Sequence, residues 1–157
     1  MIPASRVSVA LQAHRLHQVL PSGTAVVKRS RLVWTGSLRP TPLSDDYLIS
    51  LTYGLIQKPI VMVPDRLPYW RGRNRPPHLY ADGSLCLYYP PAREWRRDML
   101  LGDTILPWTA EWLLHYEIWL ATGKWMGGGI HPQQRSGSGA RNNPRPCVLV
   151  EELDSSR

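Results

Sequence analysis

Residues 76–87 read PPHLYADGSLCL, and the fold that the sequence favours is decided by this stretch. Asp82 and Gly83 are strong turn formers, and shortly after them the chain reaches Cys86 between two leucines. The wider segment 64–95 contains six prolines and no clear helical or strand pattern. An irregular stretch of that length is uncommon in a compact domain and is usually functional. Cys86 is therefore the first candidate for chemistry.

The segments that precede this stretch predict a mixed α+β domain. Residues 4–20 show helical spacing of apolar side chains and are followed by the stop signal Pro21-Ser22-Gly23. Three strand-like runs come next, at residues 24–34, 47–53 and 60–63, separated by stretches rich in turn residues. Because no helix lies between these runs, they predict an antiparallel meander.

The clearest helix is expected after Cys86. Pro107 suits its first turn, and Gly123 suits the position just past its end. An aromatic and apolar stripe should lie on one face of this helix and pack on the sheet as core: Trp108, Trp112, Tyr116, Trp119 and Leu120.

The last part of the chain differs in composition from the rest. From Gly127 it is rich in Gly, Ser, Pro and Asn, and only residues 147–150 form an apolar run, a candidate edge strand. We therefore expect one folded domain over residues 1–126 and a C-terminal segment, 127–157, that packs on this domain or trails from it.

Positive charge is spread on both sides of Cys86. The chain has 19 Lys and Arg residues against 12 Asp and Glu, a formal net charge of +7. Arginines precede the cysteine and follow it: Arg66, Arg71, Arg73, Arg75, Arg93, Arg96 and Arg97. They form either a solvated basic face or a landing site for an acidic partner. No nucleic-acid motif accompanies the charge, so direct nucleic-acid binding is not expected.

The two cysteines, Cys86 and Cys147, are too few for a disulfide framework. Residues 1–20 interrupt their apolar positions with arginines and histidines, which predicts neither a signal peptide nor a membrane span. We therefore expect a cytoplasmic protein whose thiols stay reduced and which does not associate with membranes. Cys147 lies in an apolar run, where a cysteine usually acts as a small buried hydrophobe.

The stretch 76–87 resembles the active-site signature of ubiquitin-conjugating (E2) enzymes. In that family a His-Pro-Asn triplet is followed by a Gly turn, an aliphatic residue, the catalytic cysteine and a leucine. Pro77 matches the family proline, Leu85-Cys86-Leu87 matches the aliphatic-Cys-Leu core, and Trp95 stands near the position of a family tryptophan. The resemblance spans residues 5–122 and implies the E2 fold, with a long catalytic loop between the meander and the C-terminal helix.

Two positions depart from the family pattern. Pro76 stands where the family has His, and His78 stands where it has Asn. The family Asn supports the catalytic loop and the oxyanion, and an imidazole can donate a hydrogen bond to either. The resemblance therefore implies that Cys86 is the catalytic nucleophile and that His78 takes the supporting role. The alternative for His78 is a loop histidine that faces solvent.

The helix sequence narrows the resemblance. Residues 108–119 (WTAEWLLHYEIW), with 122–125 and 127–132, are similar to bacterial E2-like proteins of CBASS anti-phage operons, which act on a cGAS-like nucleotidyltransferase (CD-NTase). The resemblance implies that Cys86 takes the C-terminal carboxyl of that protein as a thioester and passes it to an amine. We expect no cofactor and no metal. Gly127-Gly128-Gly129 follows a helix, not a strand, so it fails as a nucleotide-binding motif, and ATP-dependent activation would come from a separate enzyme.

Other functions remain as alternatives. The main one is a catalytically silent adaptor of the same fold that binds a nucleotidyltransferase or ubiquitin-like partner, although such variants usually lack the cysteine. A cysteine hydrolase would need a histidine within hydrogen-bond reach, and the chain offers His78, His115 and His131 without a protease-family pattern. A metal site built from Cys86, Cys147 and histidines lacks paired-ligand spacing.

Overall fold

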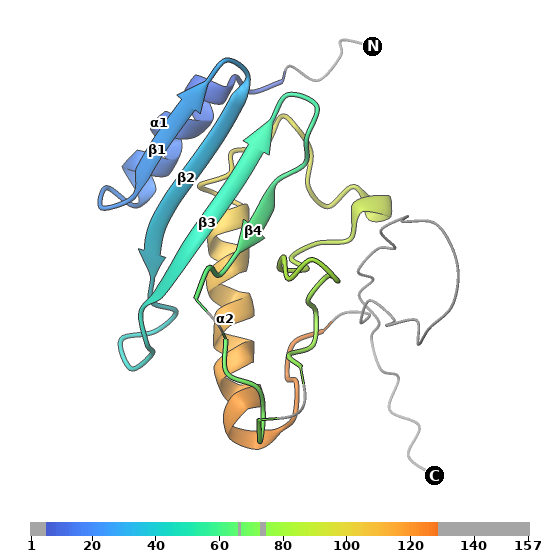
Figure 1. The fold of residues 1–157 in the computed structure, drawn as a ribbon. Coiled ribbons are helices and arrows are strands. Elements are labelled where there is room, and N and C mark those ends of the chain that lie inside the picture. The colour runs from blue at the N-terminus through green and yellow to red at the C-terminus, as the bar shows by residue number, and fades with distance from the viewer. Residues whose placement is uncertain (1–5, 66, 73–74, 129–157) are drawn as a thin grey trace.

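An antiparallel sheet of four strands, in the order β1-β2-β3-β4, forms one layer of the protein, and two α-helices lie behind it (Figure 1). The computed structural model describes residues 6–65, 67–72 and 75–128. The strands are β1 (Thr24–Lys28), β2 (Arg31–Leu38), β3 (Tyr47–Gly54) and β4 (Ile60–Met62). The helices are α1 (Val9–Val19), α2 (Ile105–Thr122) and a short 3-10 turn, η1 (Pro90–Ala92). The expected α+β class, with a helix at each end of an antiparallel meander, is confirmed.

Alternate residues of the central strands fill the core. The register places Leu32 opposite Tyr53 and Trp34 opposite Leu51, while Leu51 in turn faces Val61 of β4. All five side chains are buried, because successive residues of a strand point to opposite faces and these share the face that the helices cover.

The prediction of a first strand at residues 24–34 was wrong in one respect. Residues 24–34 do not form one strand, because the chain reverses after Lys28 and returns as β2. Arg29 adopts a left-handed backbone conformation (φ 55°), which only a few per cent of non-glycine residues do. β2 also continues through Gly36, which was expected to be a separator. A Cβ atom at Gly36 would lie 2.5 Å from the Trp34 ring, so the close packing of this indole requires glycine.

The N-terminal helix begins later than expected, at Val9, since the side chain of Ser8 caps it by accepting a hydrogen bond from the Leu11 amide. Gln12 of α1 is fully buried. Its side chain donates to the Met99 carbonyl (2.8 Å) and accepts from the Leu101 amide (2.7 Å). One polar side chain therefore joins α1 to the loop that leads into α2.

Helix α2 runs from Ile105 to Thr122, so Pro107 lies in its first turn as expected. Gly123 ends the helix in a left-handed conformation (φ 75°), and a Cβ atom there would collide with the Trp70 ring. The expected boundary after residue 126 remains a prediction. The candidate edge strand 147–150 lies outside the described residues.

We predict that Gln12→Leu will destabilise the fold by about 2–5 kcal/mol. Leucine has a similar volume but leaves the Met99 carbonyl and the Leu101 amide without their partner in a buried place. Urea unfolding followed by circular dichroism measures the loss. Gln18→Leu, an exposed position on the same helix, is the control and should change the free energy of unfolding by less than about 0.5 kcal/mol. Equal effects of the two substitutions would contradict the structural role of Gln12.

Candidate functional site

Cys86 lies at the end of a small hairpin that is attached to the sheet. Leu79 and Leu85 pair as an isolated antiparallel bridge, and the Cys86 amide donates to the His78 carbonyl (2.9 Å). The Leu85 amide donates to the Val61 carbonyl of β4 (2.8 Å). The segment that carries the cysteine is therefore fixed by backbone hydrogen bonds on both sides, and Cys86 itself is buried.

The turn of this hairpin is the one that the sequence predicted. The Gly83 amide donates to the Tyr80 carbonyl, and Gly83 has a positive φ of 85°. Asp82 accepts from the hydroxyl (2.6 Å) and the amide (2.9 Å) of Ser84. The hydrogen bond from the Ser84 hydroxyl holds the pKa of Asp82 below its ordinary value, so this carboxylate is charged at neutral pH. Arg75 also donates to the Tyr80 carbonyl and secures the turn from outside.

His78 lies directly beside the cysteine segment and is only 5% exposed, so its interpretation as a solvent-facing histidine was wrong. Its backbone is left-handed (φ 54°). Its carbonyl oxygen accepts a second hydrogen bond, from the indole nitrogen of Trp112 on α2 (3.1 Å). The imidazole ring packs on Trp125, with 5.1 Å between ring centroids. Main chain and side chain of His78 thus both contact residues that flank Cys86 in space.

Helix α2 holds the long loop at two further points. The hydroxyl of Tyr116 donates to the Pro68 carbonyl (2.8 Å), and Trp70 packs against Gly123 at the end of the helix. Trp112 and Tyr116 stack on each other, with 5.7 Å between centroids and 7° between planes. The predicted aromatic stripe is therefore core, as expected, but it also fixes the loop that carries the cysteine.

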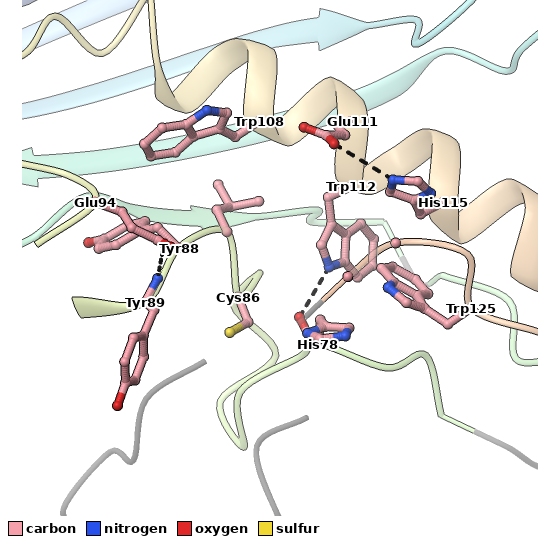
Figure 2. Close-up of a pocket in the computed structure, with 13 residues that line it drawn as sticks. His78, Cys86, Tyr88, Tyr89, Glu94, Trp108, Glu111, Trp112, His115 and Trp125 are labelled. Atoms are coloured by element: carbon pink, nitrogen blue, oxygen red, sulfur yellow. Dashed lines mark hydrogen bonds and ion pairs between the residues drawn. The ribbon is translucent and has the colours of Figure 1, made fainter. Parts of the chain in front are cut away.

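A pocket of about 340 Å³ opens between Cys86 and α2 (Figure 2). His78 and Cys86 form one side of it, and the helix contributes Trp108, Trp112 and His115. Trp125 follows the helix and comes back over the site, where its ring packs on those of His78, Trp112 and His115. The pocket is thus a largely aromatic hollow beside a cysteine.

Two carboxylates line the same pocket. Glu111 lies one helical turn before His115, and 3.8 Å separate its carboxylate from the imidazole Nε2. The Glu111 side chain is 68% exposed. Glu94 is more tightly held, because it accepts a hydrogen bond from the Tyr89 amide (2.5 Å). Sequence reasoning missed both acids as site residues, although the Glu111–His115 spacing of four residues was a visible signal.

The arginines that follow Cys86 are partly engaged within the protein. Arg96 forms an ion pair with Asp98 (3.1 Å), and Arg97 donates to the Gly54 carbonyl (3.0 Å). Arg93 is exposed. Of the arginines before the cysteine, Arg66 and Arg73 lie outside the described residues. Two of the three arginines that follow the cysteine are thus already engaged within the protein.

Cys147, the other cysteine of the chain, lies outside the described residues, so the expectation of reduced thiols stays a prediction. A thiolate is the nucleophilic form of cysteine, so the reaction expected at Cys86 needs this thiol in its reduced form. Of the other candidate histidines, His115 shares the pocket with Cys86, and His131 lies outside the described residues.

Within residues 6–65, 67–72 and 75–128, no three His, Cys, Asp or Glu side chains are arranged to hold a metal ion. No helix in these ranges combines the length and hydrophobicity that crossing a bilayer requires.

Comparison with known proteins gives one family. The family model described as "Type II CBASS E2 protein" matches residues 12–132, which is well over half of the chain and includes the cysteine hairpin and α2. A search of curated proteins finds no match.

We predict that Trp112→Phe will lower the free energy of unfolding by about 1 kcal/mol more than Trp95→Phe does. Both indoles are buried and both substitutions remove the same volume. Only Trp112 donates a hydrogen bond from its ring nitrogen, whereas Trp95 Nε1 has no partner among the described residues. Urea unfolding measures the difference. Equal losses would show that the bond to the His78 carbonyl contributes nothing to stability.

Proposed function

Because the chain belongs to the type II CBASS E2 proteins, we propose that it is an E2-type acyl carrier of bacterial anti-phage defence, with the E2 fold and with Cys86 as its nucleophile. In this proposal Cys86 forms a thioester with the C-terminal carboxyl of a protein, a cGAS-like nucleotidyltransferase, and passes the acyl group to an amine. The observation that carries the proposal is the position of Cys86, on a rigid hairpin at the side of the 340 Å³ pocket.

The chemistry divides amide formation into two steps. In the first, the Cys86 thiolate attacks an activated carboxyl and displaces its leaving group, which gives a thioester. In the second, a neutral amine attacks the thioester carbonyl, the C–N bond forms, the C–S bond breaks and the thiolate leaves. The amine proton passes to the thiolate or to water. Activation of the carboxyl is assigned to a separate ATP-dependent enzyme.

The geometry of the hairpin limits which groups can assist the reaction at Cys86. The amide of Cys86 is occupied by the His78 carbonyl, so this N–H does not point to a developing oxyanion. The His78 side chain lines the pocket beside the cysteine. We therefore assign to His78 the support of the loop or the oxyanion, the role that Asn has in E2 enzymes.

Cys86→Ser should abolish the thiol-sensitive adduct and leave, at most, a slowly formed oxyester that resists thiols. The test incubates reduced protein with the nucleotidyltransferase of its operon, the activating enzyme and ATP, and compares gels with and without thiol. Cys147→Ser is the matched control and should form the adduct as wild type does.

Three other results would be informative. A thiol-sensitive adduct in Cys86→Ser would refute the assignment of the nucleophile. Equal loss in both cysteine variants would indicate a structural pair. Stable binding of the nucleotidyltransferase without any adduct, in wild-type protein kept reduced, would favour the adaptor function instead.

His78 is tested by three substitutions that separate side chain from backbone. Asn and Gly adopt the left-handed conformation of His78 readily, whereas Ala is strained there by about 1–2 kcal/mol. We expect His78→Asn to keep most activity, because its amide can donate a hydrogen bond. His78→Gly and His78→Ala should slow discharge of the thioester by roughly ten- to a thousandfold, the cost of one lost oxyanion donor.

The rate of thioester discharge is measured in single-turnover experiments, and the free energy of unfolding of each variant is measured in parallel. A Gly variant that discharges at the wild-type rate would show that the imidazole is not needed. A loss of rate in the Asn variant, together with a wild-type rate that titrates near the ordinary histidine pKa of about 6.5, would point to a general base instead.

A further inference from the structure

Acidic and basic side chains near Cys86 line two different, neighbouring hollows. The pocket beside α2 is lined by two glutamates and two histidines, and none of its described lining residues is Lys or Arg, although such residues outnumber acids 19 to 12 in the chain. A second hollow of about 150 Å³ is lined by Lys58, Arg96 and Arg97. Tyr88 lines both hollows. The α2 pocket is therefore the acidic one.

An acidic pocket with aromatic walls suits a cation. Trp108, Trp112 and Trp125 offer indole rings, which attract an ammonium group more strongly than other aromatic side chains do. Burial of the aliphatic part of a lysine-type side chain against the same apolar surfaces would add favourable free energy to binding. A carboxylate-bearing ligand would instead meet Glu94 and Glu111.

We infer that Glu111 is the residue of this pocket that positions the acceptor, by attracting the ammonium group at the end of a lysine-type side chain. The inference rests on the proposed function and adds to it a residue that positions the acceptor amine. Glu111 fits this role better than Glu94, because the Glu94 carboxylate already accepts the Tyr89 amide. The Glu111 carboxylate is mostly exposed, and its ion pair with the His115 imidazole is long (3.8 Å).

The placement of Glu111 gives it an effect on binding more than on bond formation. It projects from α2 and lies across the pocket from Cys86, as Figure 2 shows. An incoming ammonium meets this carboxylate and passes the indole rings before it reaches the cysteine. Glu111 is thus a positioning residue that sets KM.

The experiment loads Cys86 without an activating enzyme. A short peptide with a C-terminal alkyl thioester exchanges its acyl group onto the reduced full-length protein, and discharge is then followed with two nucleophiles. Nα-acetyl-lysine amide is a cationic primary amine, and hydroxylamine is small and uncharged at neutral pH. Glu111→Gln should raise KM for the lysine amide by roughly three- to tenfold, with kcat and the hydroxylamine rate unchanged.

Two matched variants accompany this measurement. Glu111→Asp keeps the charge and should restore most of the affinity. Asp65→Asn removes one negative charge from an exposed position outside the pocket and should leave KM unchanged. An unchanged KM in Glu111→Gln, or an equal slowing with hydroxylamine, would overturn the inference. So would an equal effect of Asp65→Asn, since the net charge alone would then explain the result.

A binding measurement separates this inference from the proposed function. Three tryptophans line the pocket, so titrating unloaded Cys86→Ser protein with Nα-acetyl-lysine amide should change the tryptophan fluorescence. In the double variant that also carries Glu111→Gln, this binding should be weaker by the same factor by which Glu111→Gln raises KM. Failure of Cys86 to accept any acyl group would refute the proposed function, while this titration would still test the amine site. Binding that does not depend on Glu111 would overturn the inference and leave the acyl-carrier function intact.

Discussion

The carbonyl oxygen of His78 accepts two N–H donors, the amide of Cys86 and the indole of Trp112. One donor belongs to the hairpin and the other to α2, so this oxygen joins the cysteine segment to the helix that faces it. All three residues are buried, and a donor that lost this acceptor would have little access to water as a replacement. The separation between Cys86 and the wall of the pocket therefore depends on a backbone atom, which a substitution at position 78 leaves in place.

The aromatic face of α2 explains how one helix can be core and scaffold together. Leucines at the same positions would bury similar area, but they could not donate hydrogen bonds to the loop. Trp112 and Tyr116 each bury a large ring and use a polar edge to hold a carbonyl, of His78 and of Pro68. Other rings pack without such a bond, since Trp34 and Trp95 have no partner for Nε1 among the described residues. The abundance of Trp and Tyr is therefore only partly a matter of hydrogen bonding.

Local patterns in the sequence predicted the helices, the meander, the turn before Cys86 and the core stripe of α2. They failed where a distant contact decides the conformation. Arg29 reverses the chain without a glycine or asparagine to indicate the turn, and no local pattern marks Gln12, whose two backbone partners lie 87 and 89 residues away in the sequence.

The same limit applies to the site. Cys86 was singled out through its motif, because the cysteine and the turn are adjacent in sequence. Glu111 and His115 resemble an ordinary surface pair on a helix, and only the packing of Trp125 against His78 and His115 places them in the pocket of the cysteine. Residues brought together from separate elements leave no local pattern to detect.

Tyr88 has a further consequence for the electrostatics of the site. Burial raises the pKa of its phenol well above the ordinary value, so the side chain stays neutral where it borders both hollows. A charged residue at this position would favour one hollow's ligand and oppose the other's. A neutral ring lets an acidic and a basic surface lie next to each other with little direct pairing between them. In the proposed function the acceptor amine is drawn in as a cation, and the acidic hollow, which Cys86 also lines, is the one that suits it.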